Sequence, residues 1–245
     1  QMIKQSLGFY AANHNLRTDT LAHTAFYPQM PIVKSKYSGI TGYEQRGAGQ
    51  NFVVAVMPFY GYNINDAIII SRSAIERGLG RSTLYRTYRC EERRYPGGQK
   101  DKIEKPKPEI AGYRGDDAYK YLDEDGVVEP EFYLGPDTVL VGKTSPPRFL
   151  EEVGELGVLE EKRRENSETV QSDESGTVDW VVITEDEGGN KLIKVRTRMI
   201  MTPEVGDKFA ARHGQKGVIG LIVDEKDMPF TADGIKPDLC INPHA

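Results

Sequence analysis

The sequence predicts a mainly β protein in which two strand-rich ends enclose a loop-rich middle. Two short apolar runs, at 51–57 and 67–70, are rich in β-branched residues and bounded by turn residues, which is typical of buried strands. Two longer runs, 177–184 and 191–201, flank the turn sequence Glu-Gly-Gly-Asn and predict a β-hairpin. Residues 91–137 contain few apolar residues and predict irregular loops with short strands, so the middle of the chain resembles an insertion into one domain.

Short helices are predicted at two places in the first end. Residues 1–15 carry apolar side chains at helical spacing. Ser73 and Glu76 have the spacing of a capping box, in which the two side chains satisfy free backbone N–H groups reciprocally. Gly78 can end this second helix in a left-handed conformation, so the helix has only one or two turns.

In the middle of the chain, residues 138–142 predict a further strand. Residues 151–175 contain mostly Glu, Arg and Ser, too little apolar surface to offset the cost of ordering, and predict a flexible loop. The second strand of the hairpin alternates in polarity, which predicts one buried face and one wet face. The buried face would carry Ile193, Val195, Thr197, Met199 and Met201, and the wet face Lys194, Arg196 and Arg198.

The composition excludes several classes of protein. The 245 residues are 38% hydrophobic with a mean hydropathy of −0.54, and no apolar run is long enough to cross a membrane. The first residues contain no apolar stretch of the kind found in secretory signals. Two cysteines cannot build a disulfide framework or a four-ligand zinc site, and a reducing compartment is the simplest interpretation.

The net charge of −5 is unevenly distributed. Residues 1–81 carry a net charge of +4, residues 82–198 one of −7, and residues 199–245 one of −2. A protein that grips nucleic acid alone is usually basic. The chain therefore either does not bind nucleic acid or contributes a small basic surface to a larger assembly. The acidic middle can equally be an ordinary solvated surface.

The densest candidate for chemistry is the segment 205–217, which combines three glycines with Lys, Arg and His. In a straight strand Lys208 and Lys216 would lie about 26 Å apart. The two lysines can therefore converge on one ligand only if the chain reverses, and Gly214 is where it can do so without a Cβ penalty. Compact ammonium groups suit phosphate oxygens, although the same pattern also fits ordinary surface lysines near a turn.

The other reactive residue types give weaker signals. Asp66 precedes a predicted buried strand, where an acid is usually a turn former but can also bind Mg²⁺. We interpret His14 and His23 as helix-end and turn residues, and Cys90 and Cys240 as core or strand residues. No nucleophile and base are arranged for acyl transfer.

Several sequence blocks together resemble one family, the second-largest (β-type) subunit of multisubunit DNA-directed RNA polymerases of archaeal and eukaryotic style. The resemblance runs from end to end, more loosely in the middle, and corresponds to a central-to-C-terminal fragment of that subunit. The matching blocks are Lys4-Gln5-Ser6-Leu7-Gly8, Gly61-Tyr62-Asn63, Asp66-Ala67-Ile68-Ile69-Ile70, Ser73-Ala74-Ile75-Glu76-Arg77-Gly78-Leu79, Gly206-Asp207-Lys208-Phe209, Arg212-His213-Gly214-Gln215-Lys216-Gly217, Asp227-Met228-Pro229-Phe230-Thr231-Ala232-Asp233-Gly234, Pro237-Asp238-Leu239 and Ile241-Asn242-Pro243-His244-Ala245.

The resemblance implies a domain organisation. Residues 1–81 would form the first part of a hybrid-binding domain built as a double-psi β-barrel, and 202–245 a truncated second part. Residues 82–201 would form an inserted, β-rich wall (flap) domain. The fold class is then mainly β (α+β).

The resemblance also implies roles for the basic residues. Lys208 and Lys216 match two catalytic lysines that approach the RNA 3′ end and the nucleotide phosphates. Gln5 matches a glutamine near the RNA backbone, and Arg212 and His213 would join the RNA-binding cluster. These positions define the expected RNA-binding surface.

A role in metal binding is implied for one acid. Asp66 matches an acid close to the second, exchangeable Mg²⁺ of the family, whereas the principal ion is held by the largest subunit. The family commonly has a Glu-Asp pair at this point, and this chain has Asn65-Asp66. Because an amide supplies no negative charge, the departure weakens a role of the pair in recruiting Mg²⁺.

The implied function is that of an enzyme subunit in transcription, a nucleotidyltransferase that extends RNA on a DNA template. Expected partners are the largest and other polymerase subunits, template DNA, the RNA transcript and nucleoside triphosphates, with no membrane. The expected location is the cytoplasm and nucleoid, or the nucleus in a eukaryote, and the chain alone is expected to be inactive. The alternatives are a non-catalytic scaffold related to that subunit and a free-standing β-barrel for a small acidic ligand.

Overall fold

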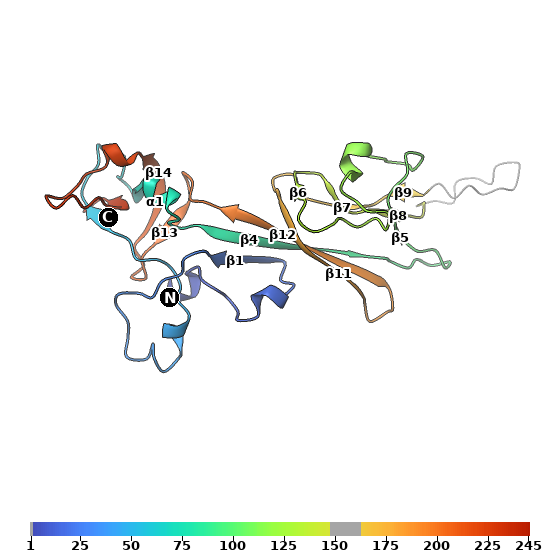
Figure 1. The fold of residues 1–245 in the computed structure, drawn as a ribbon, viewed down its shortest axis with the longest axis horizontal. Helices are drawn as coiled ribbons and strands as arrows, with labels where there is room; N and C mark the ends of the chain where they lie inside the picture. The colour runs from blue at the N-terminus through green and yellow to red at the C-terminus, as the bar shows by residue number, and fades with distance from the viewer. Residues whose placement is uncertain (1, 148–162) are drawn as a thin grey trace, which may run out of the picture. The chain divides into compact units, whose positions relative to one another are not determined.

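The computed structural model describes residues 2–147 and 163–245, which form two compact units (Figure 1). The first unit comprises 1–17, 22–84 and 200–245, and the second comprises 18–21 and 85–199. Strands dominate both units, and the prediction of a mainly β protein is confirmed. No helix in the described part of the chain is long and apolar enough to span a membrane.

The first unit contains a mixed five-stranded sheet. Its strands, in spatial order, are β13 (Lys208–Ala210), β14 (Lys216–Val223), β3 (Ala67–Ser71), β15 (Leu239–Ile241) and β2 (Val54–Val56). Strand β14 runs parallel to β3, and β15 runs antiparallel to β3 and parallel to β2. The predicted buried strand at 67–70 is confirmed, because Ile69 and Ile70 are fully buried between neighbouring strands.

The predicted strand at 51–57 forms only as β2, and it is not buried as expected. Val54 and Val56 are exposed. The physical reason is that Val54 and Val56 point to one face of the strand, whereas the core cluster packs on Ala55, which points to the other face.

The helix predicted over 1–15 does not form. The segment instead contains two 3₁₀ turns, η1 (Met2–Gln5) and η2 (His14–Leu16). The backbone between the two turns pairs with other segments: Leu7 O accepts the N–H of Gly49 at 2.7 Å, and Gly8 O accepts the N–H of Ala25 at 3.1 Å. Ala25 ends strand β1 (Leu21–Ala25), and a further 3₁₀ turn, η3, spans Tyr43–Gln45. These tertiary backbone bonds override the helical spacing of the apolar side chains.

The short helix after β3 is present as α1 (Arg72–Glu76), but its start differs from the prediction. Ser71 occupies the N-cap position, and its hydroxyl lies 2.9 Å from that of Ser73. The predicted capping box is therefore wrong, since no side chain caps the helix. The predicted end is confirmed, because Gly78 has a φ of +105° and donates to Ile75 O at 2.9 Å.

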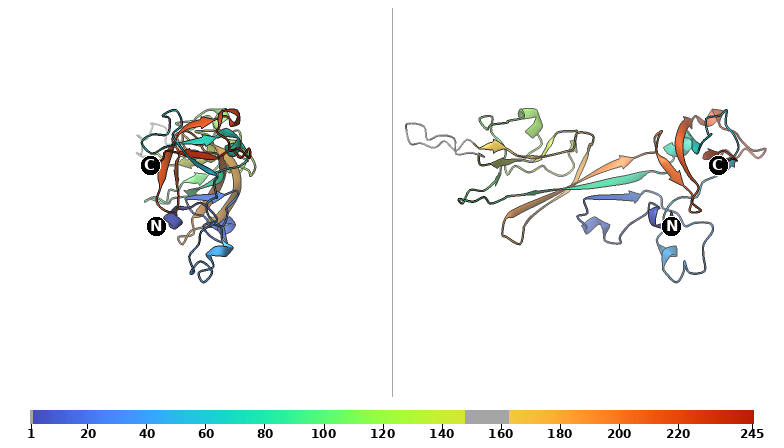
Figure 2. Two further views of the ribbon diagram at one scale, coloured as in Figure 1. Left: turned by 90° about the vertical axis from the view of Figure 1, so that its left-hand side faces the viewer. Right: turned by 180° about the vertical axis from the view of Figure 1, so that it is seen from behind.

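The second unit contains β11 (Gly176–Glu185) and most of the long strands β4 (Ser82–Glu91) and β12 (Lys191–Met201), with β6 (Tyr133–Leu134) beside β11 (Figures 1 and 2). The hairpin of β11 and β12 confirms the prediction from the sequence. At its turn, the Asp186 carboxylate accepts the N–H groups of Gly188 and Asn190 at 2.9 and 2.8 Å.

Small elements complete this unit and the end of the chain. They are β5 (Lys102–Ile103), β7 (Val139–Val141), β8 (Lys143–Ser145), β9 (Arg164–Glu165), β10 (Glu168–Thr169), η4 (Asp116–Tyr119) and, in the first unit, η5 (Glu225–Asp227). Strand β8 pairs with β5 and β9, and β7 pairs with β10. Strand β7 confirms the strand predicted at 138–142.

The expected flexible loop at 151–175 falls partly outside the described residues. Residues 151–162 of that loop are not described. The described remainder is not an irregular loop, because β9 and β10 lie within it and both are paired.

A substantial core lies where the sequence predicts only loops and short strands. Tyr119, Leu122 and Leu134 are buried and pack in one cluster with residues of β7 and β12. The apolar residues of 91–137 occur singly or in runs of two or three, such as Tyr121-Leu122 and Val127-Val128, which are too short to show a period. They reach a common core only through the tertiary fold.

Strand β12 does not have the wet face that its alternation predicts. Arg196 is only 5% exposed, and its guanidinium lies 4.8 Å from the ring centre of Tyr85 and 4.7 Å from that of Trp180. Its Nε donates to the Asp179 carboxylate at 2.7 Å. Arginine can be buried here because its flat cation stacks between two aromatic rings while the carboxylate balances its charge. At the other end of the predicted buried face, Met201 is exposed.

We expect the substitution Arg196→Lys to destabilise the chain by about 1 kcal/mol, because lysine keeps the charge but loses the stacked planar group. Urea denaturation of the 245-residue chain, followed by the fluorescence of its single tryptophan, Trp180, measures this change. Arg89→Lys is the matched control, since Arg89 lies exposed on β4. Equal unfolding midpoints for the two variants would contradict the stacking role.

Both cysteines are free and lie buried in strands, as predicted. Cys90 belongs to β4 and Cys240 to β15. Burial raises the pKa of Cys90 to about 11 and also raises that of Cys240. Both thiols are therefore neutral near pH 7, which fits packing rather than reactivity.

Candidate functional site

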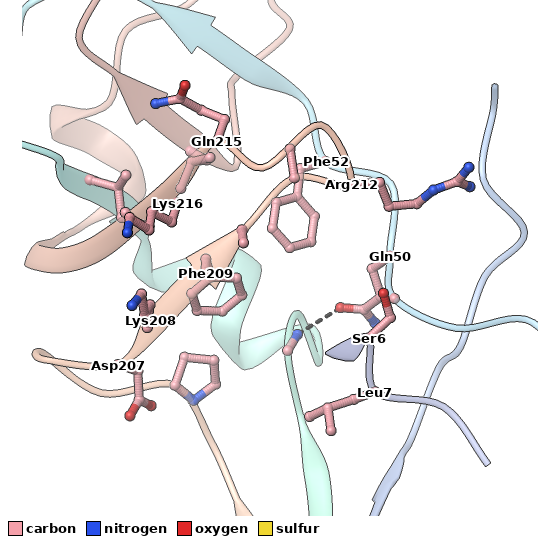
Figure 3. A pocket seen from close by; sticks show the side chains of 18 of the residues that line it. Ser6, Leu7, Gln50, Phe52, Asp207, Lys208, Phe209, Arg212, Gln215 and Lys216 are labelled. Atoms are coloured by element: carbon pink, nitrogen blue, oxygen red, sulfur yellow. Dashed lines mark hydrogen bonds between the residues drawn. The ribbon is translucent and has the colours of Figure 1, made fainter. Parts of the chain in front are cut away.

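A cavity of about 870 Å³ lies in the first unit, and the turn between β13 and β14 forms part of its wall (Figure 3). Every residue singled out from the sequence as a site residue lines this cavity: Gln5, Asp66, Lys208, Arg212, His213 and Lys216. The cavity thus joins three stretches that are far apart in the sequence.

The two lysines are brought together by a chain reversal, as their spacing requires. Strands β13 and β14 are antiparallel, and Ala211 donates to Gln215 O at 2.9 Å. Gly214 has a φ of +91° and donates to Ala211 O at 2.9 Å, so the tight turn uses a conformation that glycine adopts without strain.

Lys208 and Lys216 lie on the same face of this hairpin. Lys208 is opposite Val218, and Lys216 is opposite Ala210. Because side chains alternate along a strand, these four residues share a face. The two lysines are diagonal neighbours, a relation in which the Cα atoms are about 7–8 Å apart. Figure 3 shows the two side chains on the same side of the hairpin.

Both lysines are exposed, and within the described residues neither forms a salt bridge or a hydrogen bond through its ammonium group. Where the two ammonium groups approach each other they repel, and an anion bound between them relieves the repulsion. The face is therefore suited to a phosphate group or another anion.

A further cation, Arg212, and the imidazole of His213 come from the turn between the strands. Arg212 is half-buried, and its Nη1 is buried without a hydrogen-bond partner in the described part of the chain. His213, beside it, is exposed. Gln5, at the end of η1, adds an exposed amide. Together they give the cavity a cationic and polar margin.

Asp66 lies in a strained turn next to the hairpin. Asn65 and Asp66 have φ values of +52° and +65°, in the left-handed region that few non-glycine residues adopt. The carbonyl of Asp66 accepts the N–H of Val218 at 3.0 Å, which ties this turn to β14. Gly217 permits the contact, because a Cβ there would lie 2.5 Å from Ile68 Cγ2 and 3.0 Å from Asp66 O.

The Asp66 carboxylate is exposed and could face a metal ion. Among the described residues, however, no three His, Cys, Asp or Glu side chains are grouped as a metal site. One carboxylate fits Mg²⁺ only if water, substrate phosphates or another subunit supply the remaining oxygen ligands.

Several residues that shape the site were missed from the sequence. Asn63 is fully buried, and its side chain accepts from Phe59 N at 2.9 Å and donates to Met57 O at 2.8 Å, which fixes the loop before Asp66. His23, expected in a turn, lies on β1 and lines the cavity. The run Gly-Tyr-Asn was the one local signal for such a loop, since Asn commonly bonds to nearby backbone.

Comparison with known proteins identifies the family. A family model described as RNA polymerase Rpb2, domain 6, matches residues 1–245. The chain is 53% identical over 244 residues to the DNA-directed RNA polymerase subunit Rpo2 of Sulfolobus acidocaldarius. It is 40% identical over 245 residues to the DNA-directed RNA polymerase II subunit RPB2 of Eremothecium gossypii.

These matches cover the whole of this chain but 22% and 20% of the two relatives, so the chain spans about a fifth of their length. The family model matches the chain from end to end, and the two relatives are 53% and 40% identical to it. The chain belongs to the family of second-largest subunits of DNA-directed RNA polymerase and corresponds to their domain 6 region.

Proposed function

We propose that this chain helps to form the active centre that extends RNA on a DNA template, and that Lys208 and Lys216 position the RNA 3′ end and the nucleotide phosphates. The observation that carries the proposal is that two exposed lysines lie on one face of a hairpin whose turn contains Gly214. Neither lysine has a salt-bridge partner among the described residues. Membership of the polymerase family supplies the reaction in which such a pair is useful.

In nucleotidyl transfer, the RNA 3′ oxygen attacks the α-phosphorus of a nucleoside triphosphate, and the bond to the pyrophosphate leaving group breaks. The reaction needs little covalent help from protein and depends on positioning and on neutralising charge. Two ammonium groups on a rigid face can hold RNA phosphates so that the hydroxyl and the leaving group stay in line. The turn that carries the half-buried Arg212 and the exposed His213 would extend this surface along the RNA, and Gln5 would bond to the RNA backbone.

Mg²⁺, when bound, supplies charge neutralisation at the phosphates and polarisation of their oxygens. Asp66 is the residue of this chain that would share in holding the second ion, and the principal ion would be held by the largest subunit. Asp66 and Asp207 both line the cavity, but among the described residues no third His, Cys, Asp or Glu is grouped with them, so the share of this chain in binding that ion would be small.

The proposal extends to the domains. We infer that residues 1–81 and 202–245 form the two parts of a hybrid-binding domain of the double-psi barrel type, and that 82–201 form the wall. Apart from residues 18–21, which belong to the second unit, the division of the chain at 84/85 and 199/200 supports this arrangement. The exposed valines of β2 suit a surface that another subunit covers, and the 245-residue chain alone should not synthesise RNA.

A cross-linking experiment tests the proposed contact. We expect an amine-reactive group on the RNA 3′ end to label Lys208 and Lys216 in the assembled polymerase, whereas Lys226 and Lys236, exposed and outside the cavity, should stay unlabelled. A variant with both site lysines changed to arginine should lose the label. Labelling of neither lysine in an elongating complex would favour the alternative, a scaffold that contacts no RNA.

A further inference from the structure

We propose that Gln50 is a positioning residue that sets the placement of the lysine hairpin, although it lies outside the segment that bears the lysines. The inference rests on the proposed function, because it explains how the two proposed phosphate-binding lysines are held in place. Gln50 itself lines the same cavity.

The side chain of Gln50 bridges two backbone segments. Its Oε1 accepts the N–H of Gly80 at 2.6 Å, and its Nε2 donates to the carbonyl of Tyr27 at 3.2 Å. The dashed line at Gln50 in Figure 3 marks the bond that its side-chain oxygen accepts. Because the two bonds use opposite ends of the amide, they fix its orientation and hold Gly80 in place.

The hairpin packs against the backbone of Gly80. The φ of Gly80 is +66°, and a Cβ at this position would lie 2.8 Å from Pro203 Cγ and 3.0 Å from Phe209 Cζ. The Pro203 and Phe209 rings therefore sit directly over a bare backbone, with no side chain between. Because even one added carbon at Gly80 would crowd both rings, a shift of Gly80 toward them would have to displace them.

Phe209 connects this contact to the lysines. It lies between Lys208 and Ala210 on β13, opposite Gly217 on β14, so its ring points to the face opposite the lysines. On that face it packs on the Phe52 ring, with centroids 5.7 Å apart. The lysine face carries no ion pair from the described residues. The packing behind the hairpin therefore places the backbone from which the two lysine side chains extend.

The variant Gln50→Met tests this in the assembled polymerase, because methionine has a similar size and makes neither hydrogen bond. We expect single-nucleotide addition at saturating nucleotide to slow about three- to tenfold, the loss of one or two hydrogen bonds expressed as a rate. Gln50→Glu keeps an oxygen that can accept from Gly80 but sets a carboxylate against the Tyr27 carbonyl, so we expect its rate to fall as well. Gln45→Met is the matched control, since Gln45 is exposed and does not line the cavity.

A double-mutant cycle separates positioning from general stability. If Gln50 acts through the hairpin, Gln50→Met should slow the wild-type enzyme but add little to a variant that already carries Lys208→Ala and Lys216→Ala. Wild-type rates in Gln50→Met, or an equal slowing in both backgrounds, would overturn the positioning role. If the lysine variant itself kept the wild-type rate, the proposed function would fail instead, so the two failures are distinguishable.

Discussion

Replacing Lys208 by alanine in the assembled polymerase should slow nucleotide addition about ten- to a hundredfold. A charge-assisted hydrogen bond contributes about 1.5–3 kcal/mol. This free energy converts to that range of rates if the bond stabilises the transition state and not the ground state. Rapid-quench measurement of single-nucleotide addition at saturating nucleotide provides the readout. Assembly should be unaffected, because Lys208 is exposed and holds no salt bridge among the described residues.

The control for this substitution is Lys236→Ala. Lys236 is an exposed lysine of the same unit that does not line the cavity, and its ammonium lies 3.0 Å from the Glu225 carboxylate. Its loss should leave the rate of addition unchanged, since exposed pairs of this kind contribute little. The rate of nucleotide addition by the Lys208→Arg variant should lie between the rates of the wild type and of Lys208→Ala, because arginine keeps the charge but presents it in a different geometry. A wild-type rate in Lys208→Ala would refute the assignment.

The parts of the fold predicted correctly are those specified by neighbouring residues. The hairpin of β11 and β12 follows from two apolar runs and a glycine-rich turn, and β3 follows from three consecutive isoleucines. Gly78 ends α1 because a positive φ is a local property. In each case the signal lies within a few residues of the feature that it predicts.

The wrong predictions concern features decided by distant residues. The segment 1–15 has helical spacing, yet Leu7 and Gly8 pair with backbone from Gly49 and Ala25. Arg196 was expected on a wet face, and the rings of Tyr85 and Trp180 that bury it lie on two other strands. A local pattern contains no information about such partners.

The candidate site likewise has residues that were predicted from the sequence and a residue that was missed. The lysine spacing and Gly214 predicted a reversal, and the family resemblance supplied the roles proposed for Lys208 and Lys216. Gln50 was missed because its hydrogen bonds reach Gly80 and Tyr27, at sequence separations of 30 and 23 residues, and follow no motif. Residues that contact a ligand often lie in recognisable sequence blocks. Residues that hold those ligand-contacting residues in position are found only from the contacts in the structure.

The second large effect is expected from Gly217→Ala, which should destabilise the chain by about 1–3 kcal/mol. The added Cβ would lie 2.5 Å from Ile68 Cγ2, and Ile68 is buried in the core of the first sheet. Strands β14 and β3 would have to separate to admit it, which would also strain the bond from Val218 N to Asp66 O. Urea denaturation of the 245-residue chain, followed by far-ultraviolet circular dichroism, measures the loss.

A glycine without such a neighbour provides the matched control. Gly135 has no atom within 4 Å of an ideal Cβ and, like Gly217, no positive φ, so Gly135→Ala should not lower stability. The steric cause can be isolated with Ile68→Leu, which removes the methyl group that the new Cβ would meet. If that cause is correct, Gly217→Ala should cost less in the Ile68→Leu background than in the wild type. Equal costs in both backgrounds would mean that the close approach of β14 to β3 is not what requires glycine at this position.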